Sequence, residues 1–322
     1  MRPQDRGYFE IWIWLDTSTD LMDAPPLMPK PLERTTISIP IHLRPHDSAG
    51  IVAIFDHFRC VGATVDINQP HHIAAVSVNH NTSAYMELML RSLFARHQAG
   101  VSLSLTIFDN ASTDDMRGLR SYATQVHVPI APSGFSLTTE YNSHGDVLRR
   151  FVLDHPNCTH YLFLDADVCF IEANTLLTML ANLERNPTLF GIGPRMSWDG
   201  ITEIPMAVRQ SNPDICDARL HPCCALIPNT PLFRSVVEVI GFACVKYLWA
   251  EREEYLDTFK LMTRVMHTHG LHHTLSSALI QHFFCVSYEW DSAETQRHKT
   301  EMRDQRLAEL RFLEAQKAAS LS

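Results

Sequence analysis

The 322-residue sequence lacks the long apolar segments that anchor a chain in a lipid bilayer. It has no run of about 20 uncharged apolar residues, which is the length that a membrane-spanning helix needs. The apolar stretch at residues 8–15 is short, is interrupted by Glu10 and is followed by no small-residue cleavage site, unlike a signal peptide. We therefore expect no transmembrane segment and a cytoplasmic protein.

Positive charge is also scarce. The chain has 27 Lys and Arg against 36 Asp and Glu, a formal net charge of −9 and a pI near 6.0. This balance argues against nucleic acid as a partner, because nucleic-acid-binding domains carry a basic surface.

The eight cysteines are unevenly spaced and include no Cys-x₂-Cys pair. A zinc site is one interpretation of the group Cys216, His221, Cys223 and Cys224, but the adjacent pair lacks the usual ligand spacing. The sequence favours buried thiols at these positions, in a chain long enough to fold without disulfides.

Two carboxylates stand out at the end of an apolar stretch. Residues 159–164 read Thr-His-Tyr-Leu-Phe-Leu and lead directly into Asp165 and Asp167. Such a run is typical of a central strand buried on both faces, and the two-residue period puts both carboxylates on the same side. Like charges this close repel each other, so the pair predicts a divalent cation bound through oxygen ligands. The alternative is a turn with two solvated aspartates.

Strand and helix patterns alternate around this pair, which predicts an α/β fold with a mostly parallel sheet flanked by helices. The predicted strands are residues 35–43, 73–78, 102–108, 159–164, 189–192 and 275–280, and the predicted helices are 84–96, 115–123, 146–154, 174–185, 232–240, 247–264 and 293–319.

Polar residues follow three of these strands: Asn79 after the first apolar strand of the alternation, Asp109 and Asn110 after the next, and the Asp165 pair. The carboxyl ends of parallel strands meet at one edge, where open α/β sheets bind their ligands. His144 precedes a helix whose N-terminal amides would favour an anion such as a diphosphate, although an unliganded turn histidine is an equal alternative.

The pattern divides the chain into an N-terminal extension of unclear role (1–70), a central domain (71–290) and a C-terminal segment (291–322). The last segment forms an amphipathic helix with balanced charge. We expect it to pack on the domain or on a second subunit of a homo-oligomer.

The ordered motifs Val-Ser-Val-Asn-His-Asn at 76–81, Ile-Phe-Asp-Asn at 107–110 and Phe-Leu-Asp-Ala-Asp at 163–167 resemble family 2 glycosyltransferases with the GT-A fold, a Rossmann-like sheet. The match covers about residues 73–290. The resemblance implies an inverting hexosyltransferase that uses a nucleotide-diphosphate sugar and Mn²⁺ or Mg²⁺. The acceptor would be a hydroxyl of a glycan, a lipid-linked sugar or a small molecule.

The resemblance also assigns roles to residues. It implies that Asp109 contacts the donor base, that Ser77 and Asn79 line the same pocket with Asn110, and that Asp165 lies against the ribose and sugar. Asp167 would ligate the cation together with a late histidine, for which His282 fits by position and His267 or His269 are alternatives. A general base would lie on a helix among residues 251–257, with Asp257 preferred and then Glu254 and Glu253.

Two other functions stay open at this point. A sugar-nucleotide nucleotidyltransferase would need a glycine-rich, basic loop after the first strand of the alternation, and residues 79–82 contain neither glycine nor a basic residue apart from His80. A non-catalytic nucleotide-sugar-binding protein would keep the pocket without the base. The sequence identifies neither the sugar and nucleotide nor the acceptor.

Overall fold

The computed structural model describes residues 9–11, 37–39, 71–96, 101–134, 143–198, 202–215, 217–243, 245–249, 252–286 and 291–321. The chain divides into two compact units. The smaller one, Met1–Arg59 with Cys244–Asp257, contains two antiparallel strand pairs: β1 (Phe9–Ile11) with β2 (Ile37–Ile39), and β10 (Val245–Trp249) with β11 (Arg252–Leu256). The larger one is Cys60–Ala243 with Thr258–Ser322. The domain boundaries at residues 70 and 290 stay predictions.

The larger unit is built on an eight-stranded sheet in the order β5-β4-β3-β6-β9-β8-β12-β7. Its strands are β3 (His72–Asn79), β4 (Ser102–Asp109), β5 (Ile130–Pro132), β6 (His160–Leu164), β7 (Val168–Phe170), β8 (Leu189–Ser197), β9 (Cys224–Pro228) and β12 (His272–His282).

Most strands of this sheet run the same way. Parallel pairing joins β5, β4, β3 and β6, and also β8 and β12, whereas β9 runs antiparallel to both of its neighbours and β7 antiparallel to β12. The predicted fold class, an α/β fold with a mostly parallel sheet flanked by helices, is confirmed. The chain order reverses between β3 and β6, and such a switch point is where open α/β sheets form a ligand crevice.

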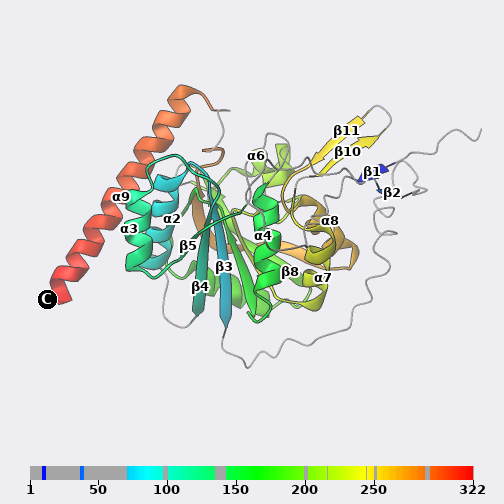
Figure 1. Ribbon diagram of the computed structural model, residues 1–322, viewed down its shortest axis with the longest axis horizontal. Helices are drawn as coiled ribbons and strands as arrows, with labels where there is room; N and C mark the ends of the chain where they lie inside the picture. The colour runs from blue at the N-terminus through cyan, green and yellow to red at the C-terminus, as the bar shows by residue number, and fades with distance from the viewer. Residues whose placement is uncertain are drawn as a thin grey trace, which may run out of the picture. The chain divides into compact units, whose positions relative to one another are not determined.

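Helices cover both faces of this sheet. They are α2 (Ser83–Arg96), α3 (Arg117–Gln125), α4 (Ser143–Asp154), α5 (Thr175–Glu184), α6 (Met206–Ser211), α7 (Pro231–Ile240), α8 (Lys260–Thr268) and α9 (Ala293–Leu321), with a short 3₁₀ turn at Pro213–Ile215. Figure 1 shows α2 and α3 on one side of the sheet and α4, α7 and α8 on the other.

The central strand β6 supplies side chains to both layers, as its unbroken apolar run predicts. Leu162 and Leu164 join an aliphatic cluster with α2, α3 and α5. The alternate residues Tyr161 and Phe163 enter an aromatic group on the opposite face, where the ring of Phe163 lies 5.0 Å from that of Phe259. Burial on both faces therefore fixes the strand that ends at Asp165.

The C-terminal helix α9 packs along α2 (Figure 1). Leu307 and Leu310 are buried in this contact, and Arg311 Nη2 donates to Glu87 Oε1 over 2.7 Å. On the same helix Phe312 is 62% exposed and Leu313 is 55% exposed. Homo-oligomerisation through this helix stays a prediction. Among the described helices, none combines the length and hydropathy needed to cross a membrane.

The prediction of a helix over residues 247–264 is wrong. The structure places the hairpin β10–β11 there, followed by the shorter helix α8. Residues 245–249 and 252–256 read Val-Lys-Tyr-Leu-Trp and Arg-Glu-Glu-Tyr-Leu, and their aromatic and aliphatic content also suits a strand. Three glutamates at residues 251–254 led to the prediction of a charged helix face. In the structure Glu254 lies in a strand, and Asp257 directly follows that strand.

The buried histidine of β6 predicts a stability loss in acid. Burial, with His71 as a lesser cause, lowers the pKa of His160 from 6.5 to about 4. As the pH falls from 6.5 to 4, the unfolded chain takes up a proton at this residue while the folded chain does not. We expect His160 to account for about 2–3 kcal/mol of the loss in free energy of unfolding between pH 7 and about pH 4.5.

Urea unfolding at the two pH values measures this effect. His160→Gln should show a correspondingly smaller pH dependence than the wild type, and the exposed histidine variant His298→Gln should match the wild type. Equal pH dependence in all three proteins would contradict the assignment.

Candidate active site

Two aspartates occupy the turn that follows the central strand β6. Asp165 and Asp167 lie between β6 and β7, and the backbone holds the turn at both ends. The Asp165 N–H donates to the carbonyl of Cys223 over 2.9 Å, and the Asp167 carbonyl accepts from the N–H of Phe283 over 3.0 Å. The turn is thus tied to the start of β9 and to the end of β12.

One imidazole faces both carboxylates. His282 is the last residue of β12 and is 4% exposed. Its Nε2 lies 3.2 Å from Asp167 Oδ1 and 3.9 Å from Asp165 Oδ2. One ligand atom from each of these three residues lies within 4.8 Å of the other two, which suits a divalent cation held by carboxylate and imidazole ligands.

The two carboxylates differ in electrostatic environment. Burial raises the pKa of Asp165, and the nearby His144 partly offsets this effect. For Asp167 burial acts in the same direction, but the charge and hydrogen bond of His282 outweigh it and lower the pKa. Asp165 therefore holds its proton more tightly than Asp167, which is how two carboxylates in one site reduce their repulsion.

His144 reaches the site from α4. Its Nε2 lies 3.8 Å from Asp165 Oδ1, and the side chain is 28% exposed. The next residue, Gly145, packs so closely that a Cβ there would lie 2.5 Å from the backbone nitrogen of Ala243. This contact seats the first turn of α4 and holds His144 beside Asp165.

Asn79 connects the ends of β3 and β4. Its amide nitrogen donates to Ser83 Oγ over 3.0 Å, to Asp109 Oδ1 over 3.1 Å and to Ser112 Oγ over 2.9 Å. Its oxygen accepts from Thr82 over 3.1 Å. Asn79 is fully buried, so its side chain orients Asp109 rather than presenting free polar atoms to a ligand.

Two other predicted pocket residues also turn inward. Asn110 is 2% exposed and its side-chain oxygen accepts from the Ser133 hydroxyl over 2.7 Å. Ser77 is fully buried, and its hydroxyl has no hydrogen-bond partner among the described residues. Asp109 remains half-buried at the strand end, where its second oxygen lies 3.4 Å from the N–H of Ser112.

The assignment of Asp257 as the general base stays a prediction. Asp257 is the last residue of the smaller unit. Glu251 lies outside the described residues, and so do the side chains of Glu253 and Glu254. The alternative cation ligand His267 stacks on His273 near the start of β12. An 11-residue strand spans roughly 35 Å, so His267 lies far from His282.

Sequence reasoning missed the neighbours of His282. The ring of His221 lies 5.3 Å from the ring of His282. A ligand atom of Cys223 lies within 4.8 Å of one from each of these histidines. Burial, and then the charge of Arg219, lower the pKa of His221 well below its usual range, so this imidazole is neutral. The sequence offered Cys216, His221, Cys223 and Cys224 as a zinc group but favoured buried thiols because of their spacing. It gave no sign that β9 runs antiparallel beside β6 and brings His221 to His282. Cys216 lies outside the described residues.

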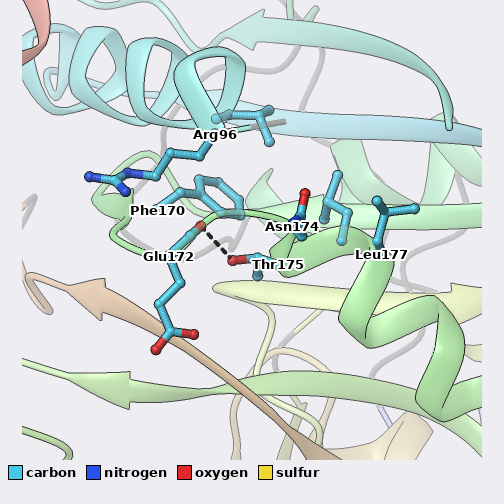
Figure 2. A pocket seen from close by; sticks show the side chains of 8 residues that line it. Arg96, Phe170, Glu172, Asn174, Thr175 and Leu177 are labelled. Atoms are coloured by element: carbon cyan, nitrogen blue, oxygen red, sulfur yellow. Dashed lines mark hydrogen bonds between the residues drawn. The ribbon is translucent and has the colours of Figure 1, made fainter. Parts of the chain in front are cut away.

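A separate pocket lies at the far end of α2. Figure 2 shows Arg96, Phe170, Glu172, Asn174 and Thr175 around it, with the Thr175 hydroxyl donating to the Glu172 carbonyl over 3.1 Å. Its lining contains none of the predicted site residues. The candidate cation site is the group at His282 and not this pocket.

Comparison with known proteins gives structural likenesses without sequence matches. No protein-family profile and no curated protein matches the sequence. A mannosyltransferase from Pyrobaculum calidifontis, solved with GDP-Man and Mn²⁺, is 12% identical with a TM-score of 0.46, over 73% of this chain and 62% of that one. Glucosyl-3-phosphoglycerate synthase from Mycobacterium tuberculosis is 13% identical with a TM-score of 0.41, over 73% and 80%.

The same synthase in complex with Mn²⁺, UDP-Glc and phosphoglyceric acid is 13% identical with a TM-score of 0.36, over 58% of this chain and 62% of that one. This chain aligns with less than two thirds of the mannosyltransferase. Each of these structures is less than 25% identical to this chain and has a TM-score below 0.5. At such low identity and TM-score, only the residues of the site bear on the function.

The Asn79 hub predicts a stability effect. Asn79→Ala would leave buried hydroxyl and carboxylate groups without their partner, so we expect the free energy of unfolding to fall by about 2–4 kcal/mol. Urea unfolding measures it, with the exposed Asn157→Ala as the matched control. Identical unfolding midpoints for the two variants would show that the network does not support the strand ends.

Proposed function

We propose that this chain is a metal-dependent glycosyltransferase that moves a sugar from a nucleotide-diphosphate donor to an acceptor hydroxyl. The observation that carries the proposal is the meeting of three side chains at one edge of a mostly parallel sheet: Asp165 and Asp167, which follow the switch-point strand β6, and His282 at the end of β12. Carboxylate and imidazole ligands in this arrangement fit Mn²⁺ or Mg²⁺. Such a cation would supply positive charge that stabilises a departing diphosphate.

The other residues of this edge fit the two ends of the donor. Asp167 and His282 would hold the cation, and Asp165 with His144 would lie against the ribose, sugar and diphosphate. The N-terminal amides of α4 next to His144 favour an anion. Asp109, oriented by Asn79, would accept a hydrogen bond from the base, with Ser77 and Asn110 behind it.

The finer assignments follow the motif resemblance. We propose an inverting, family 2-like reaction in which Asp257 takes the proton of the acceptor hydroxyl, with Glu254 as second choice. The acceptor would be a glycan, a lipid-linked sugar or a small molecule, and the setting cytoplasmic. A binding protein that lacks the base is the alternative that the experiments below separate.

Donor binding should stabilise the protein and should require Asp167. With a nucleotide sugar at about 100 times its Kd and Mn²⁺ present, mass action adds about 2.7 kcal/mol to the free energy of unfolding. A thermal-shift panel of UDP, GDP, CDP and dTDP sugars, with and without Mn²⁺, measures this. Asp167→Asn should lose the metal-dependent shift, because one anionic ligand is removed.

The control is the same substitution at an exposed aspartate outside the proposed cation ligands. Asp115→Asn alters a side chain that is 59% exposed and pairs with Arg117, so it should keep the full shift. No shift with any nucleotide sugar, in wild-type protein that binds Mn²⁺, would contradict a donor site.

The base assignment has its own test. Asp257→Asn should lower kcat by about 10²–10⁴ while the donor-induced thermal shift stays unchanged, because the base acts on the acceptor. Steady-state kinetics with an acceptor found by screening would measure it, and Asp115→Asn is again the control. Unchanged kcat in Asp257→Asn together with a loss in Glu254→Gln would move the role to Glu254.

A further inference from the structure

A second set of metal-binding side chains meets at His282. One ligand atom from each of His221, Cys223 and His282 lies within 4.8 Å of the other two. His221 and Cys223 precede β9, whose first residue pairs with the last residue of β6. The antiparallel course of β9 thus carries a thiol and an imidazole to the edge where the carboxylates lie.

The two ring nitrogens of His282 differ in their contacts. Its Nε2 faces Asp167 Oδ1 over 3.2 Å. Its Nδ1 is buried and has no hydrogen-bond partner within the described part of the chain. A buried polar atom without a partner costs about 1–3 kcal/mol, which a metal bond at Nδ1 would remove.

The other two ligands lie beside each other, with His221 half-buried and Cys223 buried. The Cys223 N–H donates to His221 Nδ1 over 3.2 Å, a long contact that a metal bond to this nitrogen would replace. Cys223 is 1% exposed, and its sulfur lies 3.3 Å from the thioether of Met196. Sulfur and imidazole ligands select zinc-like cations, whereas carboxylates suit Mn²⁺ and Mg²⁺.

We propose that His221, Cys223 and His282 form a second metal site, which prefers Zn²⁺ to Mn²⁺ and shares His282 with the carboxylate site. Bond lengths of about 2.0–2.3 Å require these ligand atoms to approach one another by about 1 Å on binding. Zn²⁺ binding displaces the thiol proton to solvent, with no change of oxidation state. Because one ring serves both sets, each ion changes the affinity for the other by the same factor.

Metal binding itself tests the site, independently of sugar transfer. The full chain, with thiols reduced and metals removed, would be titrated with Zn²⁺ against a chromophoric chelator, and with Co²⁺ while a thiolate-to-metal absorption band is followed. We expect Cys223→Ser to lose this band and to weaken Zn²⁺ binding by at least about 10-fold. The matched control is Cys224→Ser, which changes a fully buried neighbouring thiol outside the set and should keep both.

A further variant separates the two sites. Asp167→Asn should lose the Mn²⁺ response and keep the thiolate band, because Asp167 belongs to the carboxylate set. Loss of the band in this variant would mean one mixed site and would overturn the proposal. Equal Zn²⁺ affinity in Cys223→Ser and wild type would also overturn it.

If circular dichroism shows that Cys223→Ser does not fold, an alkylation experiment on Cys223 takes the place of this variant. In Cys224→Ser protein, Zn²⁺ should slow alkylation of Cys223, read by peptide mass, and Mn²⁺ should not. No protection of Cys223 by Zn²⁺ would overturn the proposal. Nucleotide-sugar binding without Zn²⁺ binding would overturn only the zinc site. Zn²⁺ binding without nucleotide-sugar binding would overturn only the proposed function.

Discussion

Repulsion between two carboxylates in one buried turn is the constraint that shapes this end of the sheet. Asp165 and Asp167 point toward the same imidazole, and opposite shifts in their pKa values relieve part of the repulsion. The backbone cannot release it by moving the turn, because hydrogen bonds to Cys223 and Phe283 fix both aspartates. Like charges kept together at this cost support the proposal of a bound cation.

The direction of the strands explains why these residues meet. The parallel strands β3, β4, β6 and β12 deliver Asn79, Asp109, Asp165 and His282 at their carboxyl ends. The two reversed strands contribute from their amino ends, so Cys223 before β9 and Asp167 before β7 arrive at the same edge. Residues more than 200 positions apart thus share one edge, with hydrogen bonds between Asn79 and Asp109 setting the distance between neighbouring strand ends.

Sequence periodicity predicted strands β3, β4, β6 and β12 but missed β9 and placed a helix over the hairpin β10–β11. The apolar run of β6 has one interpretation, because both of its faces are covered by helices, and its end placed Asp165 and Asp167 correctly at the sheet edge. The hairpin at 245–256 carries charges within a strand pattern, so its period was ambiguous and a helix was predicted. The contact of His221 with His282 depends on an antiparallel pairing that no local pattern encodes.

Strain next to His282 bears on how firmly the shared imidazole is held. After β12 the chain passes through Phe284 and Cys285 with φ values of 50° and 51°, a conformation that costs non-glycine residues about 1–3 kcal/mol each. This turn brings the ring of Phe284 to 3.9 Å from that of His282 and to 6.3 Å from that of His221. Two imidazoles are therefore packed against one aromatic ring. Because neither ring can rotate away without breaking this packing, an ion that moves His282 on one side must alter the ligand geometry on the other.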